Sequence, residues 1–299
     1  MVHFPGKSST WATALLIFVT FIWGFTFVTN QFILATMSVA DLMAWRFVIA
    51  ACVMIVAKPN AIFKLPKAQI QHGCVLGALL SIGYFAQMAG LKDTHLTATA
   101  SGFITGMFVV LTPLISGFIF KQPIHRNAWI AVALATLGLG LIALKGWSFG
   151  HAELITFICA VLFACHIVGL GRWSKPEFVF GLTTVQLSVV AMFSVVFSIV
   201  QGGPHFPSSI QVWIAIVFLA VMASSLGFFA QTWVQSHVSA TRAAIILTME
   251  PVFAGIAGVT IGTDDLTPKL VIGATCILVA MYVVELTPKS DTKVLPIEM

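Results

Sequence analysis

Long apolar stretches alternate with short polar links along most of this 299-residue chain. Each stretch is continuously apolar, which favours helices over the alternating pattern of membrane β-strands. A hydrocarbon core about 30 Å thick needs roughly 20 apolar residues per helix. The pattern predicts ten such helices, at residues 11–30, 38–57, 73–91, 97–120, 127–145, 151–170, 178–201, 211–234, 239–261 and 268–286.

The links between these stretches carry residues that end helices, such as Lys58-Pro59-Asn60 and Gly202-Gly203-Pro204. The first stretch is uncharged from Trp11 to Val28, which is too long for the apolar part of a cleavable signal. We therefore interpret it as the first transmembrane helix. Residues 1–10 and 287–299 are predicted to be short cytoplasmic tails.

Composition strengthens the membrane interpretation. The chain is 59% hydrophobic and 8% charged, and its mean hydropathy is +1.02. A soluble domain of this size would carry roughly 25% charged residues, so lipid must cover most of this surface. The sequence therefore predicts an all-α membrane protein that is embedded in a lipid bilayer. Its length leaves no room for a sizeable soluble domain.

The net charge of +5 does not indicate a nucleic-acid partner, because the basic residues are scattered through short links. Such links orient membrane proteins, with Lys and Arg in excess on the cytoplasmic side. Both termini are predicted to be cytoplasmic, in the plasma membrane (a bacterial inner membrane). The basic residues then inside are Lys7, Lys58, Lys64, Lys67, Lys121, Arg126, Arg172, Lys175, Lys289 and Lys293, whereas Lys92, Lys145 and Lys269 lie outside.

No cofactor, metal or nucleotide site is expected. The five cysteines fall inside apolar segments and lack the spacing of a metal site or a disulfide framework. Gly6-Lys7-Ser8 lacks the leading glycine of a phosphate-binding loop, which disfavours an ATP-driven pump. The cysteines are Cys52, Cys74, Cys159, Cys165 and Cys276.

The two halves of the chain share a motif. Ala98–Ile104 resembles Ala240–Ile246, and each is followed by a proline predicted to kink its helix, Pro113 or Pro251. The repeat unit would then be five helices, at residues 11–145 and 151–286. Because five is odd, the two units must be inverted, which is a common plan of secondary transporters with substrate near the midplane.

Several short motifs make the chain resemble the EamA branch of the drug/metabolite transporter superfamily. Each motif is weak alone, but their order, spacing and duplication are specific and cover residues 11–286. They are Phe21–Phe27, Ala44–Phe47, Ser101–Gly106, Leu111–Leu114, Trp129–Val132, Leu137–Leu139, Ala230–Gln231, Ser239–Ala244, Glu250–Phe253 and Ile272–Ala274.

The resemblance implies ten helices in two inverted five-helix units, around a cavity lined mainly by predicted helices 1, 3, 4, 6, 8 and 9. One departure follows helix 9, where many relatives carry an acidic Gly-Glu stretch and this chain reads Gly262–Leu266. We expect this departure to affect only the link.

Glu250 is the sharpest functional candidate. It sits about halfway along residues 239–261, where a charge is costly, so it should face a cavity or be neutralised. It would couple transport to protons or bind a cationic group. The alternative is a structural carboxyl beside the helix break at Pro251.

Two arginines are gate or anchor candidates. Arg46 would contact an anion in the cavity; the alternative, which we favour, is that it snorkels or pairs with Asp41 near the outer surface. Arg242 lies eight residues before Glu250, on roughly the same side of the helix. It would act as a gate, contact a substrate carboxylate or anchor the helix at the interface.

The remaining cavity candidates are polar or aromatic residues within apolar helices. Buried amides need partners, which are either the substrate or neighbouring helices. A lone histidine would relay protons or make a helix contact, and aromatic rings would wall the cavity or pack. These candidates are Trp23, Phe27, Tyr84, Gln87, Thr105, His166 and Gln231.

Together these features favour a secondary transporter that exports small metabolites, such as amino acids or amphipathic drugs, by alternating access. Alternatives are a passive facilitator or exchanger, or a lipid-translocating protein. A membrane-embedded enzyme is disfavoured: His-Glu-x-x-His is absent, and Gly146-Trp147-Ser148-Phe149-Gly150 lacks the strand–turn–helix context of a nucleophile elbow. Partners are then a small-molecule substrate and protons, and the chain is a monomer or a homodimer.

Overall fold

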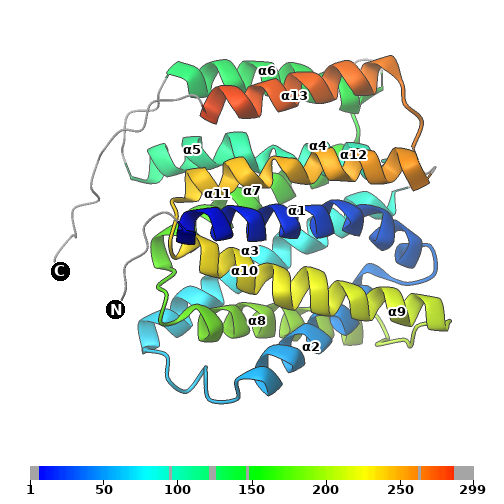
Figure 1. The fold of residues 1–299 in the computed structure, drawn as a ribbon. Coiled ribbons are helices and arrows are strands. Elements are labelled where there is room, and N and C mark those ends of the chain that lie inside the picture. The colour runs from blue at the N-terminus through cyan, green and yellow to red at the C-terminus, as the bar shows by residue number, and fades with distance from the viewer. Residues whose placement is uncertain (1–6, 94–95, 121–125, 146–147, 262–263, 286–299) are drawn as a thin grey trace.

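A computed structural model describes residues 7–93, 96–120, 126–145, 148–261 and 264–285. Figure 1 shows their helices running side by side across the molecule, which confirms the all-helical class. The elements are α1 (Lys7–Leu34), α2 (Val39–Ala57), α3 (Lys67–Lys92), α4 (Ala98–Gly106), α5 (Phe108–Ile119), α6 (Arg126–Ala143), β1 (Leu144–Lys145), β2 (Ser148–Phe149), α7 (His151–Trp173), α8 (Val179–Val200), α9 (Ile210–Phe218), the π-helix η1 (Leu219–Leu226), α10 (Gly227–Gln235), α11 (Ala240–Leu247), α12 (Met249–Ile261) and α13 (Pro268–Glu285).

Every predicted apolar stretch contains a helix or a run of successive helices. Seven helical segments of the described part are long and apolar enough to cross a membrane. Three further apolar helices are shorter, at Trp129–Gly138, Met249–Ile261 and Pro268–Ala280. The membrane-protein class therefore stands, and the count of ten crossings stays a prediction.

A two-residue strand pair, which the sequence did not predict, joins the two predicted units. Leu144 of β1 pairs with Phe149 of β2 in antiparallel register. The link lies between α6 and α7, so it separates the halves of the chain without adding a layer.

Polar residues before the apolar runs set where several helices begin. The Ser38 hydroxyl accepts a hydrogen bond from the backbone N–H of Asp41 at 3.0 Å, and Thr97 does the same for Ala100 at 3.1 Å. Such caps satisfy N–H groups that the first helical turn leaves without partners. They fix the first residues of α2 and α4.

Three predicted membrane helices are interrupted near their middle. The fourth breaks at Met107, between α4 and α5, and Pro113 lies farther on, inside α5. The ninth breaks at Thr248, so Pro251 falls in the first turn of α12, where its missing N–H costs little. In the eighth, the turn widens into the π-helix η1, which the sequence did not predict.

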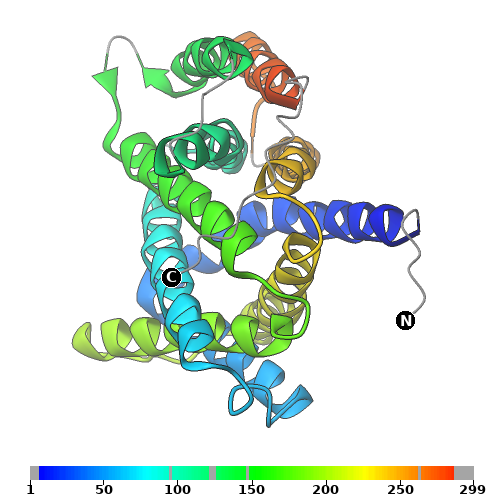
Figure 2. The ribbon, with the colours of Figure 1, turned by 90° about the vertical axis from the view of Figure 1, so that its left-hand side faces the viewer.

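Helices that occupy equivalent places in the two units run antiparallel. The start of α4 packs on α12, whereas α5 packs on α11. Ser198 near the end of α8 donates a hydrogen bond to Asp41 near the start of α2. The two closely packed helices α6 and α13 lie at one edge of the bundle (Figure 2). Antiparallel partners are what an inverted five-plus-five arrangement requires.

The link after α12 reaches across to the other unit. Asp264 is 8% exposed, and its Oδ2 accepts a hydrogen bond of 2.7 Å from the backbone N–H of Thr99 in the first turn of α4. A carboxylate there complements the partial positive charge of a helix N-terminus. The expectation that this part of the sequence affects only its own link is wrong.

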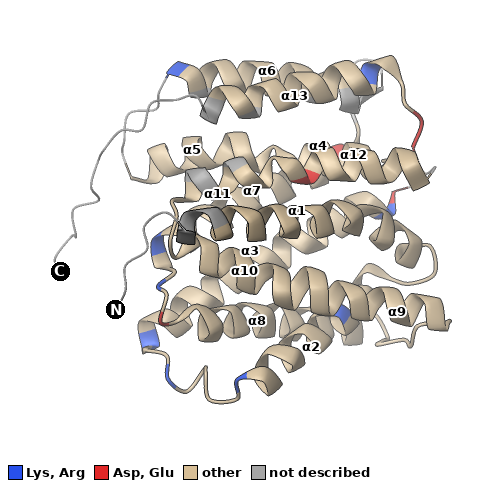
Figure 3. Cartoon of the chain, viewed as in Figure 1, with Lys and Arg blue, Asp and Glu red and all other residues tan. Residues whose placement is uncertain are grey.

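The described Lys and Arg residues gather mainly at one end of the helices in Figure 3. The middle of the bundle is almost free of charge in the same view. This distribution is typical of a protein whose two ends face water and whose middle faces lipid.

Candidate binding pocket

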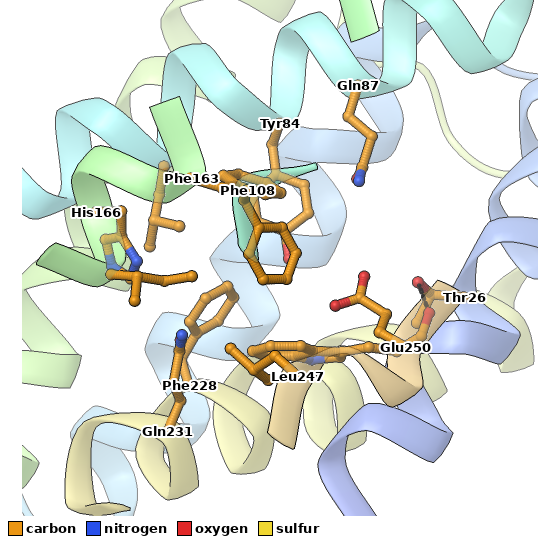
Figure 4. A pocket seen from close by; sticks show the side chains of 13 residues that line it. Thr26, Tyr84, Gln87, Phe108, Phe163, His166, Phe228, Gln231, Leu247 and Glu250 are labelled. Atoms are coloured by element: carbon orange, nitrogen blue, oxygen red, sulfur yellow. Dashed lines mark hydrogen bonds between the residues drawn. The ribbon is translucent and has the colours of Figure 1, made fainter. Parts of the chain in front are cut away.

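A pocket lies in the middle of the bundle. Its empty volume is about 440 Å³, which includes space open to solvent. Both predicted units contribute to it, through α1, α3 and α5 on one side and α7, α10, α11 and α12 on the other (Figure 4). Its walls are formed by Trp23, Thr26, Leu80, Tyr84, Gln87, Phe108, Phe163, His166, Ile167, Phe228, Gln231, Leu247 and Glu250.

Close helix contacts bring α12 to the pocket. A Cβ atom at Gly24 of α1 would lie 2.5 Å from the Cβ of Phe253, and one at Gly102 of α4 would lie 2.6 Å from the Cβ of Ala254. Glycine is therefore required at both points. In membranes, helices associate through such small residues. The two contacts hold the first turns of α12 against α1 and α4.

Glu250 is the charged side chain of the pocket wall. It is 7% exposed, and its carboxyl points into the pocket in Figure 4. It has no hydrogen-bond or ion-pair partner among the described residues. It lies in the first turn of α12, whose partial positive charge favours a carboxylate there. The break at Thr248 thus places a helix N-terminus beside the carboxyl.

Aromatic rings form most of the remaining wall. The ring of Trp23 lies 5.4 Å from that of Phe228, between centroids, and Tyr84 contacts Phe163 at 5.2 Å. The Trp23 Nε1–H donates to the Ala223 carbonyl of η1 at 2.8 Å. Because that N–H is already bonded, Trp23 presents its ring rather than its donor to the pocket.

His166 is a helix contact and a pocket residue at once. Gln186 Nε2 donates to the Leu182 carbonyl at 3.2 Å, which turns its Oε1 toward His166 Nε2 at 2.8 Å. Because that oxygen only accepts, Nε2 of the neutral ring carries the hydrogen and Nδ1 is left as an acceptor. Gln231 on the same wall has an Oε1 without a partner among the described residues.

The structure brings six of the eight predicted cavity residues together: Trp23, Tyr84, Gln87, His166, Gln231 and Glu250. Thr105 lies behind the wall, where its hydroxyl accepts a hydrogen bond from Gln87 Nε2 at 3.3 Å. Phe27 lies outside the pocket, packed with Ala98, Ala254 and Ala257 between α1, α4 and α12. For Phe27 the structure therefore favours packing.

Arg46 does not occupy the place that we favoured for it. It is 1% exposed, its Nε donates to Ser224 Oγ at 2.8 Å, and its guanidinium carbon lies 4.9 Å from the centre of the Tyr84 ring. Its Nη1 has no partner among the described residues. Asp41 instead accepts from Ser198 and from His205 Nδ1. The expected pairing with Asp41 is wrong, because that carboxyl faces the link after α8.

Arg242 belongs to α11, but its side chain lies outside the described residues. The proposed gate or anchor role at this position stays a prediction.

Sequence reasoning missed several wall residues. Phe108, Phe163 and Phe228 are three of 25 phenylalanines, and several others are exposed on the outside of the molecule, so residue type gave no signal. Thr26 follows Trp23 by three residues on α1, which is the spacing of one helix face. That spacing was the available signal for Thr26.

The model of the EamA-like transporter family matches residues 10–144 and 151–286. The chain is 30% identical to a protein of Archaeoglobus fulgidus named as an uncharacterized transporter, over 94% of this chain and 88% of that protein. It is 27% identical to the uncharacterized transporter YyaM of Bacillus subtilis, over 90% of this chain and 93% of that protein. A solved crystal structure, 20% identical, superposes with a TM-score of 0.67 over 92% of this chain and 96% of that one.

The apolar helices, the antiparallel equivalent pairs and the central pocket define a two-repeat, multi-pass helical membrane protein of the transporter class. The chain belongs to the EamA-like transporter family. This confirms the resemblance read from the sequence motifs. Transport is therefore its general activity, and small molecules and a lipid bilayer are its partners.

Proposed function

We propose that the chain is a secondary transporter that exports a small solute across the plasma membrane by alternating access around the pocket. One observation carries the proposal: both units supply walls to a single pocket, and their equivalent helices run antiparallel. In inverted-repeat transporters the substrate binds at the interface of the repeats, and one repeat rocks against the other.

Glu250 is proposed to couple this movement to protons. An ionised carboxyl without a partner is expensive inside a membrane, so a proton or a substrate has to neutralise it while the pocket is closed. The sequence contains no phosphate-binding loop. A proton gradient is therefore the energy source we propose. The mixture of aromatic rings and a few polar groups suits small metabolites such as amino acids, or amphipathic drugs.

Reconstituted proteoliposomes test the proposal. A panel of labelled metabolites and drugs is offered with and without an imposed pH gradient. We expect at least one solute to accumulate against its concentration gradient only when the pH gradient is present. Glu250→Gln should abolish this accumulation. Glu153→Gln, a buried carboxyl of α7 outside the pocket, should retain it.

Three results would count against this function. Movement that never exceeds equilibration would favour a passive facilitator. Scrambling of labelled lipid without solute movement would favour a lipid-translocating protein. A Glu250→Gln variant that keeps the rate and pH dependence of the unchanged protein would remove the coupling role.

A further inference from the structure

The charge on the pocket wall is of one sign. Glu250 is the one charged side chain among the residues that line the pocket. It is buried, points into the free space and has no partner in the described part of the chain. A solute that carries a carboxylate would meet no cation on this wall, whereas a solute that carries an ammonium group would meet a counter-ion.

The rings around the carboxyl suit the same kind of ligand. Trp23, Tyr84, Phe108, Phe163 and Phe228 all line the pocket. The face of an aromatic ring carries negative charge density and attracts cations, more strongly when water is excluded. The aromatic rings of the wall can also pack against the apolar part of a ligand. The wall therefore offers one counter-ion and several ring faces to a cation with an apolar or aromatic body.

Arg46 is the nearby cation that could reverse this preference, but it is not part of the wall. Tyr84 stands between it and the pocket, and the guanidinium lies against the Tyr84 ring. Its Nε donates a hydrogen bond to Ser224 Oγ of η1, which is not a wall residue. Its positive charge acts alike on a proton and on an ammonium group at Glu250, so it does not decide between them.

Given the transport function proposed above, we propose that the substrates are small organic cations, with an ammonium group on an apolar or aromatic body, and that this group and a proton take turns on the Glu250 carboxyl. When the cation binds, the protonated carboxyl releases its proton and becomes a carboxylate. When a proton returns, the cation is released. One monovalent cation is thereby exchanged for one proton.

Other titratable groups stand near this carboxyl. They are Tyr84 of α3 and Cys159 and His166 of α7, with Arg46 of α2 behind Tyr84. The described wall residues of α1, α5, α10 and α11 are not titratable. Of these groups, Glu250 is the one that can carry the negative charge an ammonium group needs near neutral pH.

Binding of four small probes to the purified full-length protein tests the proposal by calorimetry in detergent. Benzyltrimethylammonium is a permanent cation, 2-phenylethanol is neutral, phenylacetate is an anion and phenylalanine is a zwitterion. We expect the cation to bind more tightly than the other three. Its affinity should fall as pH falls, by up to about tenfold per pH unit, because one proton competes for one carboxyl. Binding of 2-phenylethanol should not change with pH.

Three variants locate the effect. Glu250→Gln should lower the affinity for benzyltrimethylammonium by about tenfold or more. Its affinity for 2-phenylethanol should not change, which also shows that the pocket is intact. Glu250→Asp keeps the carboxyl, so the variant should still bind the cation, with the same dependence on pH. Glu153→Gln should resemble the unchanged protein. In proteoliposomes, a benzyltrimethylammonium gradient should drive protons the other way, read by an enclosed pH dye.

Four outcomes overturn the proposal: tighter binding of phenylacetate or phenylalanine than of the cation; cation binding that Glu250→Gln leaves unchanged; cation binding without pH dependence; or failure of all four probes to bind. If solutes still accumulate in the proteoliposome panel, only this substrate class falls and the transport function stands. If no solute of the panel moves, the proposed function itself falls.

Discussion

Arg46 is a charge buried where most charges would be costly. In the described part of the chain it has no acidic partner; instead it has a serine hydroxyl and two ring faces, those of Phe47 and Tyr84. Contacts of this kind recover part of the cost of desolvation, since rings attract a guanidinium most strongly away from water. Its place behind Tyr84 suggests that it holds that ring in the pocket wall.

Arg46→Met tests this positioning role. A buried ion replaced by an apolar side chain of similar length is often neutral or stabilising, so the melting temperature in detergent should not fall. Transport should fall by about tenfold, because Tyr84 loses the cation against its ring. Thermal unfolding and proteoliposome flux are measured on the same preparation. Lys64→Met, at an exposed lysine, should change neither. A large drop in melting temperature would mean that Arg46 is a stabilising residue instead.

Single residues differ in how far the sequence predicts their place. Glu250 was predictable because a carboxyl in the middle of an apolar stretch has few alternatives to a cavity. The partners of Arg46 were not, since Ser224 lies far along the chain and only tertiary packing brings it near. Phe27 and Trp23 lie four apart on α1, but they face different neighbours.

Among the secondary-structure elements, the interrupted helices are the ones that position the pocket. The start of α12 carries Glu250, and the start of α5 carries Phe108, so both breaks open directly onto the pocket. A residue before or within the first turn of a helix lies near a partial positive charge. The prolines predicted a departure from a regular helix, but the positions of the breaks depend on packing, and Pro113 is accommodated inside α5.

The hydrogen bond between Asp264 and α4 gives a prediction at this scale. Asp264→Ala removes the acceptor of the Thr99 N–H, while Thr97 still caps α4, and should lower the free energy of unfolding by about 1 kcal/mol. The measurement is thermal or denaturant unfolding in detergent. Asp265→Ala is the matched control, because Asp265 is the exposed neighbour and should tolerate the change. Equal stability of the two variants would contradict a capping role for Asp264.

The widened turn of η1 is the element that the sequence least prepared us for. Ser225 Oγ contacts the Ala220 carbonyl at 2.9 Å and the Ala50 carbonyl of α2 at 3.1 Å, while Trp23 donates to Ala223. A π-helical turn shifts which carbonyls lack an N–H partner, and here side chains of α1 and of η1 itself occupy them. The hydropathy of residues 211–234 is the same with or without such a turn, so the pattern could not reveal it.

For the whole molecule, the order of apolar stretches predicted where the helical segments lie along the chain, because lipid forces backbone polar groups into helices. To predict how these segments are arranged, the motif that repeats in the two halves of the chain was needed as well. The side of the membrane on which each end lies rests on the distribution of Lys and Arg alone, and it stays a prediction.

Accessibility labelling tests that topology. In a chain whose five cysteines are replaced, single cysteines at positions 64 and 145 should react from opposite sides of the membrane. A membrane-impermeant maleimide applied to intact cells should label position 145 and spare position 64, because the excess of basic residues keeps the latter inside. Permeabilised cells provide the control in which both react. Labelling of the two positions from one side would refute the inverted ten-helix topology.

The break at Thr248 turns one membrane crossing into two rods that meet at the pocket. One rod, α12, is held against α1 and α4 by the contacts at Gly24 and Gly102 and by the hydrogen bond from Thr99 to Asp264, whereas the other, α11, packs on α5, α1 and α7. The two rods share α1 but differ in their other neighbours, α4 for α12 and α5 and α7 for α11, and Glu250 lies where the rods meet. When either rod tilts, its end beside Glu250 moves. The group bound to the Glu250 carboxyl can therefore decide whether the two rods move separately or together.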